Sequence, residues 1–75
     1  MKNKMRIKKD ISMFEKNLNK LKKRNEKLTD KQKKTIELAN QYYNDSKYYL
    51  EKQDYFTAFG CINYAHGLLD AIIKF

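Results

Sequence analysis

The sequence predicts an all-α fold, a three-helix bundle made of a basic N-terminal helix and an antiparallel helical hairpin. The chain of 75 residues contains no proline and only two glycines, and this scarcity of turn residues favours a few long helices over a sheet. Apolar residues recur every three or four positions in three successive stretches, which is the spacing of amphipathic helices. A chain this short forms one domain with a small core, so residues 1–75 are taken as a single helical domain.

Residues 1–28 are predicted to form the basic amphipathic helix. Several of its lysines are three or four residues apart, so like charges are neighbours on one face. Each such pair costs roughly 0.2–0.5 kcal/mol, and we expect salt or a bound anion to stabilise this helix. The apolar seam consists of Ile7, Ile11, Phe14, Leu18, Leu21 and Leu28. The candidate anion-binding stripe on the opposite face consists of Lys9, Lys16, Lys20, Lys23 and Lys27.

The first helix is expected to end near Leu28, because Thr29-Asp30-Lys31-Gln32 fits a capping box for a helix that starts at Asp30. One continuous helix from Ile7 to Lys52 is the alternative. Asn25 occupies a seam position and has two interpretations. The helix frays there, or a polar seam residue fixes the register of a helix pair.

Residues 29–75 are predicted to form the hairpin, with helices over about Asp30–Lys52 and Tyr55–Phe75. Asp54 can cap the later helix, and the short Gln53-Asp54 link makes the two helices antiparallel. The buried stripe of the earlier helix is Ile36, Ala39, Tyr43, Ser46 and Leu50. The later helix has one stripe of Ala58, Ile62, Ala65, Leu69 and Ile72, and a second of Cys61, Tyr64, Leu68 and Phe75. Two stripes indicate two neighbours, of which the second is either the N-terminal helix or another subunit.

Charge is distributed unevenly along the chain. The net charge is +8, but residues 1–34 carry 14 Lys and Arg against four acidic residues, and residues 35–75 carry three against five. Nine of the ten aromatic residues lie in the second part. Such asymmetry is typical of a protein with an anionic partner, although it bears on association and not on the fold.

Cysteine and hydropathy usage indicate the compartment. Cys61 is the single cysteine and cannot form an internal disulfide, so a reducing cytoplasm is expected. No signal peptide is predicted, because Lys8, Lys9 and Asp10 interrupt the apolar run that would follow the charged start. No segment is expected to approach the roughly 18 apolar residues of a membrane span, so no membrane partner is expected.

The hairpin resembles a single tetratricopeptide-repeat helix pair. The matching positions, in order, are Tyr42, Ser46, Tyr49, Asp54-Tyr55, Ala58 and Ala65. Gln53 stands where such repeats usually have glycine, and Asp70 stands where proline would end the repeat. Repeat arrays need about three or more units, so the likeness implies a way of packing two helices and not a peptide-binding groove.

A second resemblance covers most of the chain. Residues 42–50, Tyr-Tyr-Asn-Asp-Ser-Lys-Tyr-Tyr-Leu, and the continuation through Ala71 are similar to a small archaeal family of helical proteins. That family is catalogued as a domain of unknown function, number 357. The resemblance is specific over residues 42–71. It implies a short helical bundle and supplies no activity.

Four polar side chains of the hairpin form a candidate cluster, namely Asp45, Asn63, His66 and Asp70. His66 and Asp70 are four residues apart on one helix, a spacing that can orient an imidazole for acid–base chemistry or supply two metal ligands. The structural alternative is a histidine bonded at the edge of the core. Cys61 does not share a face with His66, so no nucleophile and base can be paired. The sequence therefore predicts no catalytic set, metal site, cofactor or small-molecule substrate.

Gly60, Gly67 and Ala71 fall on nearly one helical face. Each glycine costs about 1 kcal/mol relative to alanine inside a helix. Close approach of another helix would explain them, and we expect that helix to come from the same chain or from a homodimer partner.

These observations favour a non-enzymatic helical module for protein interaction or self-association. The alternative is sequence-tolerant nucleic-acid binding through the lysine stripe, which would be phosphate-dominated and salt-dependent. A helix lying on a membrane surface is a third possibility. A solvated lysine face without a partner is the simplest interpretation of the charge.

Overall fold

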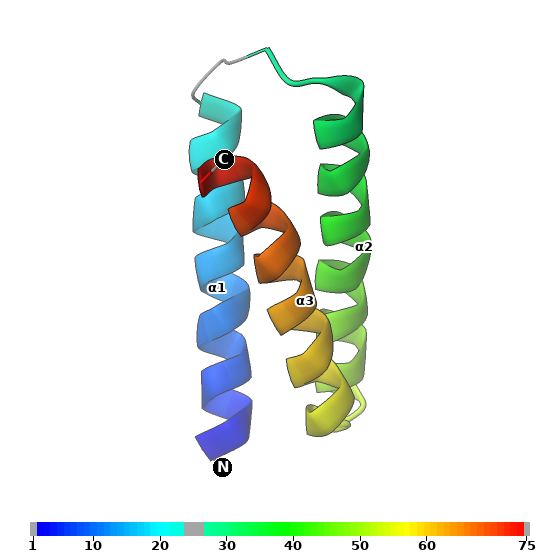
Figure 1. Cartoon of the computed structure of the whole chain (residues 1–75). Coiled ribbons are helices and arrows are strands. Elements are labelled where there is room, and N and C mark those ends of the chain that lie inside the picture. Colours follow the sequence, from blue (N-terminus) through cyan, green and yellow to red (C-terminus); the bar gives the residue numbers. More distant parts are fainter. Residues whose placement is uncertain (1, 24–26, 75) are drawn as a thin grey trace.

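A computed structural model describes residues 2–23 and 27–74, and the side chains of residues 3–23 and 27–73. It contains three helices, α1 (Lys2–Lys23), α2 (Asp30–Glu51) and α3 (Tyr55–Lys74), and the described residues include no strand. The helices pack side by side in a bundle measuring 40 × 17 × 16 Å. Along the bundle, α1 and α3 run in one direction and α2 runs in the other (Figure 1). The predicted all-α three-helix bundle is confirmed.

The first helix ends earlier than predicted. It stops at Lys23, and residues 27–29 are not helical, so Lys27 and Leu28 do not lie on α1. A basic last turn suits a helix C-terminus, whereas a longer helix would bring more lysines into contact with like charges. The continuous helix over residues 7–52 is wrong. Asn25 lies outside the described residues.

The second helix begins with the predicted capping box. The Gln32 backbone N–H donates to Thr29 Oγ1 at 3.1 Å, and the Thr29 backbone N–H donates to Gln32 Oε1 at 2.9 Å. Thr29 is in the extended region, with φ −69° and ψ 161°. These two bonds satisfy donors that a helix start otherwise leaves unpaired.

The α2–α3 turn is short and closely hydrogen-bonded. The Asp54 N–H donates to the Tyr49 carbonyl at 2.9 Å, and the Gln53 N–H donates to the Leu50 carbonyl at 3.0 Å. These are the bonds of a Schellman motif, with Gln53 in the left-handed region at φ 64°. Asp54 then caps α3 by accepting from the Thr57 N–H at 3.2 Å, as predicted. The turn makes α2 and α3 antiparallel.

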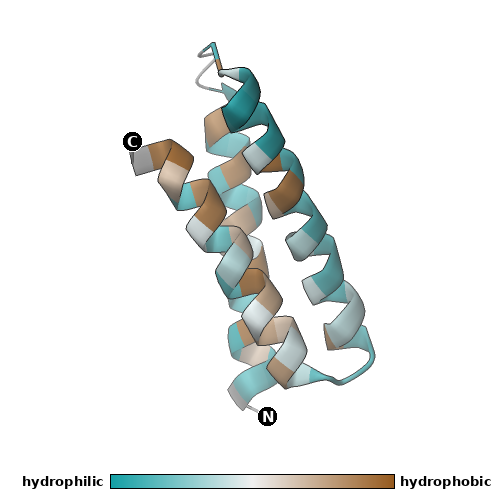
Figure 2. Ribbon diagram, turned by 45° about the vertical axis from the view of Figure 1, so that its right-hand side comes forward, coloured by the Kyte–Doolittle hydropathy of each residue, from teal (hydrophilic) through white to brown (hydrophobic). Residues whose placement is uncertain are grey.

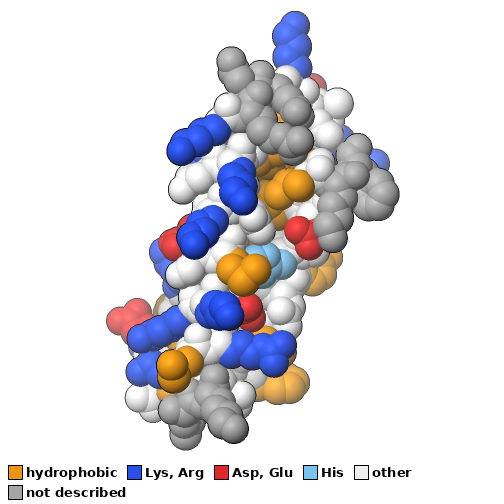
Figure 3. Space-filling view, turned by 90° about the vertical axis from the view of Figure 1, so that its left-hand side faces the viewer, with side chains coloured by type: hydrophobic (Ala, Val, Ile, Leu, Met, Phe, Trp, Pro, Cys, Tyr) orange, Lys and Arg blue, Asp and Glu red, His pale blue; other side chains and the backbone are white. Residues whose placement is uncertain are grey.

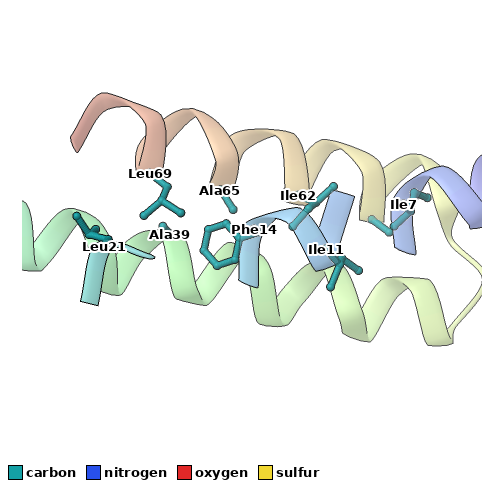
Figure 4. Close-up of a cluster of buried hydrophobic side chains, with 9 residues drawn as sticks. Ile7, Ile11, Phe14, Leu21, Ala39, Ile62, Ala65 and Leu69 are labelled. Carbon is teal, nitrogen blue, oxygen red and sulfur yellow. The ribbon is translucent and has the colours of Figure 1, made fainter. Parts of the chain in front are cut away.

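The core lies where α3 meets both other helices. Phe14 of α1 is fully buried between Ala39 of α2 and Ala65 of α3 (Figure 4). Most tertiary contacts join α3 to α2, fewer join α3 to α1, and α1 and α2 touch least. The buried apolar residues are Ile7, Ile11, Phe14, Leu21, Ala39, Ala58, Ile62, Ala65 and Leu69. The N-terminal helix therefore supplies the second neighbour of α3. It does not cover the whole predicted second stripe, because Tyr64 is exposed and stacks on Tyr42 of α2. Phe75 of that stripe lies outside the described residues.

One buried polar side chain is also part of this core. Ser46 of α2 is fully buried, and its hydroxyl donates to the carbonyl oxygen of Ala58 in α3 at 2.7 Å. Buried hydroxyls are costly unless bonded. The small side chains at both positions let the two helices approach closely enough for this bond.

The third helix is the most apolar part of the bundle. Figure 2 shows that brown and pale residues make up most of α3, with hydrophilic residues between them, whereas α2 is mostly hydrophilic. Over Tyr55–Ile73, 19 residues, it has the length and composition of a membrane span. This corrects the expectation that no segment approaches a span. The core helix of a soluble protein can have the same length and composition. Here α3 buries Ala58, Ile62, Ala65 and Leu69 inside the bundle, and 22% of the apolar stretch is buried.

Candidate interaction surface

One face of α3 points away from both other helices. We call it the α3 outer face, and its six residues are exposed: Phe56, Gly60, Asn63, Tyr64, Gly67 and Ala71. Phe56 is 92% exposed and Tyr64 is 53% exposed. None of the six side chains is charged, although charged residues make up 35% of the chain. An uncharged surface with exposed aromatic rings has a composition that is more typical of binding patches than of solvated surfaces.

The two glycines of this face lie in open space. A Cβ atom built on Gly60 or on Gly67 would have no heavy atom within 4 Å outside its own helical backbone. No described part of the chain approaches them, so the expected intramolecular contact is not formed. The reason is that α1 and α2 both pack on the side of α3 that carries Ala58, Ile62, Ala65 and Leu69. An interface role of Gly60, Gly67 and Ala71 stays a prediction.

The borders of the face are fixed by contacts with both neighbouring helices. On the α2 side, the Tyr64 ring stacks on Tyr42 with centroids 4.6 Å apart. On the α1 side, the Arg6 guanidinium lies 5.5 Å from the centroid of the Phe59 ring. A shallow hollow of about 210 Å³ runs beside Tyr64, Gly67 and Leu68. These contacts hold the exposed aromatic surface in a defined shape.

The predicted polar cluster is not gathered into one site. His66 is half-buried, and its Nε2 lies 2.7 Å from the main-chain carbonyl oxygen of Asp10 in α1. The carbonyl can only accept, so Nε2–H donates. Asp45 lies on the other side of α3, where its charge acts on Cys61. Asn63 is exposed on the α3 outer face, and Asp70 is half-buried.

Two carboxylates act on the single cysteine. Burial raises the pKa of the Cys61 thiol, and the carboxylates of Asp45 and Asp54 raise it further. A thiol with a raised pKa is a poor nucleophile. Among the described residues, no three His, Cys, Asp or Glu side chains are grouped so as to hold a metal ion.

A tyrosine links α1 to α2 near the centre of the bundle. The Tyr43 hydroxyl donates to the Glu15 carboxylate, and the Tyr43 ring stacks on Phe14 with centroids 5.0 Å apart. Burial, together with the bond to Glu15 and its negative charge, raises the pKa of Tyr43 to about 12. This contact serves helix packing.

The lysine stripe is exposed but shorter than predicted. Lys9, Lys16, Lys20 and Lys23 are exposed on α1, whereas Lys27 is exposed in the connection beyond the helix. Figure 3 shows blue Lys and Arg side chains distributed along the face that α1 presents, with hydrophobic side chains among them. The exposed hydrophobic side chains of α1 include Met5 and Met13.

Sequence reasoning identified the small residues of the α3 outer face and missed its most exposed aromatic. Phe56 stands four residues before Gly60, and Tyr64 stands four residues after it. Residues four apart share a helical face, so the spacing could have joined Phe56 to the face. Outside α3, Tyr48 of α2 is also exposed, by 55%.

Comparison with known proteins identifies a family. The model of the family described as "Protein of unknown function (DUF357)" matches residues 9–75. The resemblance drawn from residues 42–71 is thereby confirmed at the family level. A search of curated proteins found no match. The likeness of the hairpin to a tetratricopeptide pair stays a prediction.

Proposed function

The chain belongs to the DUF357 family of proteins of unknown function, and we propose that it is a non-enzymatic helical interaction module. Its binding surface is the α3 outer face. The proposed compartment is the cytoplasm, where the single cysteine stays reduced.

The observation that carries this proposal is the exposure of an uncharged aromatic face on an otherwise highly charged protein. Because Phe56 lies almost fully in water, the chain lacks the stabilisation of about 1.5–3 kcal/mol that burying this side chain would give. Two glycines inside the same helix cost about 1 kcal/mol each relative to alanine. Neither cost is offset by a contact among the described residues, since the space around both glycines is open. A bound protein surface would offset both.

Site-specific photo-crosslinking in cells tests the proposal. A photoreactive phenylalanine analogue replaces Phe56 in one variant and Tyr48 in another. Both positions are exposed aromatics, but Tyr48 lies on α2. We expect adducts at position 56 that are absent at position 48 and that disappear when Gly67→Glu is added. Equal adducts at both positions, or adducts unaffected by Gly67→Glu, would contradict the proposal.

Nucleic-acid binding through α1 is the second candidate function. It is favoured by the four exposed lysines on α1, which stand three to seven residues apart on the helix. Such binding would be dominated by phosphate contacts and would fall steeply with salt. It does not compete with the α3 outer face, because α1 packs against a different side of α3.

A charge-matched pair of triple variants tests this candidate. Lys16, Lys20 and Lys23 are changed to Glu in one variant, and Lys31, Lys33 and Lys34 of α2 are changed to Glu in the other. All six lysines are exposed, and the net charge falls equally. In mobility shifts with unrelated RNA and DNA, we expect only the α1 variant to lose binding. Equal loss in both variants would indicate non-specific charge attraction.

A further inference from the structure

The α3 outer face has an internal symmetry, and this symmetry identifies a partner for the proposed interaction function. Its six residues are arranged evenly about the midpoint between Asn63 and Tyr64. Gly60 and Gly67 are equally far from that midpoint, and so are Phe56 and Ala71. A surface that is symmetric in this way can contact a copy of itself across a two-fold axis.

We propose that α3 pairs with α3 of a second copy of this chain, antiparallel and about a two-fold axis that passes between Asn63 and Tyr64. In this register Gly60 is level with Gly67 of the second copy, and Phe56 is level with Ala71. The inference rests on the interaction function proposed above and gives it a specific partner.

Side-chain sizes along the face fit this register. On each side of the two-fold axis, a glycine of one helix faces a glycine of the other helix. The two backbones can therefore approach closely. Packed helices are usually about 8–10 Å apart, and glycines favour the short end of that range. The largest exposed ring, Phe56, is level with a methyl group at Ala71 and has room to lie across the second helix. The space that is open around both glycines in one chain is thereby filled.

Charge also favours a second copy over a charged partner. The face carries no charged side chain, so two copies meet without burying an unpaired charge, which would be costly. The basic helix is kept out of the contact, because Arg6 and Asp10 of α1 lie against Phe59 and His66 at the border of α3. Each copy still carries a net charge of +8. The two copies therefore repel at long range, and salt screens this repulsion within about 10 Å at 0.1 M.

The proposed contact is small, and small interfaces are typical of weak or transient complexes. From Phe56 to Ala71 the face spans about 22 Å along the helix. A single pair of helices of this length lies at the small end of protein interfaces, below roughly 1,200 Å² in total. We therefore expect a dimer with a dissociation constant on the order of micromolar, which strengthens when salt is raised.

Disulfide trapping tests the antiparallel register. In a Cys61→Ser background, Asn63→Cys puts a thiol beside the proposed axis, with the two Cα atoms inside the ~4.4–6.8 Å window of a disulfide. Phe56→Cys is the matched control, because position 56 is more exposed but lies about 22 Å along the axis from its copy. Under mild oxidation we expect the Asn63→Cys chain to form a covalent dimer at least ten-fold faster. Equal trapping of both, or faster trapping of Phe56→Cys, would overturn the register.

Light scattering of the cysteine-containing wild-type chain, under reducing conditions and at several concentrations, tests the dimer itself. Gly67→Glu is expected to give monomers at every concentration, whereas Gln41→Glu on the exposed surface of α2 is expected to leave the dimer intact. Gly67→Glu folds, because a side chain there meets open space and glutamate favours helix. A wild-type monomer at the highest concentration, or a dimer that salt weakens, would overturn the proposal.

Two further outcomes separate the partner from the function. A monomer that crosslinks to a different protein through position 56 would remove the second copy and keep the interaction function. A monomer without position-specific adducts that floats with uncharged lipid vesicles would remove both, and would assign the face to a membrane surface.

Discussion

The imidazole Nε2 of His66 lies 2.7 Å from the main-chain carbonyl oxygen of Asp10, so the single histidine of the chain joins α3 to α1. The same ring meets Phe14 edge to face, with centroids 5.9 Å apart and planes at 86°. The spacing of the sequence had suggested Asp70 as the partner of His66. The bundle instead uses the histidine to hold the N-terminal helix against the hairpin.

Replacing His66 should therefore loosen the docking of α1. We expect His66→Ala to lower the free energy of unfolding by about 1–3 kcal/mol, because a hydrogen bond and an aromatic contact are lost together. Urea denaturation followed by circular dichroism measures the change. Asp70→Asn is the control and should change stability by less than about 0.5 kcal/mol. A larger effect of Asp70→Asn than of His66→Ala would indicate that Asp70 is the partner of His66.

The left-handed residue in the α2–α3 turn offers a stabilising substitution. Gln53 has φ 64°, a conformation that costs a residue with a Cβ atom roughly 1–2 kcal/mol. Gln53→Gly removes this cost but makes the unfolded chain more flexible, so we expect a net gain of about 0.5–1 kcal/mol in thermal or chemical denaturation. Gln53→Ala keeps the Cβ atom and should bring no gain. Equal stabilities of the two variants would contradict the prediction.

The buried hydroxyl between α2 and α3 should be worth about one hydrogen bond. Ser46→Ala removes the donor to the Ala58 carbonyl, and we expect a loss of about 1 kcal/mol in the free energy of unfolding. Ser12→Ala is the matched control, because Ser12 is exposed on α1, and it should change stability by less than about 0.5 kcal/mol. If Ser46→Ala proved neutral, close packing alone would account for a small residue there.

Alkaline pH should weaken the Tyr43–Glu15 contact. The pKa of Tyr43 is raised from 10.0 to about 12 in the folded chain, first by burial and then by Glu15. Below pH 10 both the folded and unfolded chains hold this proton, so the contribution of Tyr43 to stability is fully present. Between pH 10 and about 12 the unfolded chain loses the proton first, so stability falls as pH rises.

Denaturation across this pH range measures the effect. We expect Tyr43→Phe to be less stable than wild type at neutral pH and to lose less stability between pH 10 and 12. Tyr48→Phe also removes one tyrosine, but from an exposed position, and it should keep the alkaline loss of wild type. If Tyr43→Phe lost as much stability between pH 10 and 12 as wild type, another group would be responsible for the loss.

Much of the fold can be predicted from local patterns. The Thr29 capping box, the Asp54 cap and the apolar spacing of each helix depend on residues within one or two turns of one another, so the sequence alone indicates three helices and their order. The end of α1 at Lys23 was missed, because a seam that continues to Leu28 is compatible with both a longer helix and a linker.

The candidate site also depends partly on local sequence and partly on tertiary packing. Residues four or seven apart on α3 share a face whatever surrounds them, so the sequence by itself determined that Gly60, Gly67 and Ala71 lie together. Only the tertiary structure decided which side of α3 is covered. Phe14 of α1 and His66 of α3 hold α1 against the covered side of α3, together with α2. Phe56, Gly60 and Gly67 lie on the other side of α3 and therefore remain exposed. The partner of His66 was decided in the same way, by a contact across 56 residues of sequence that no local spacing encodes.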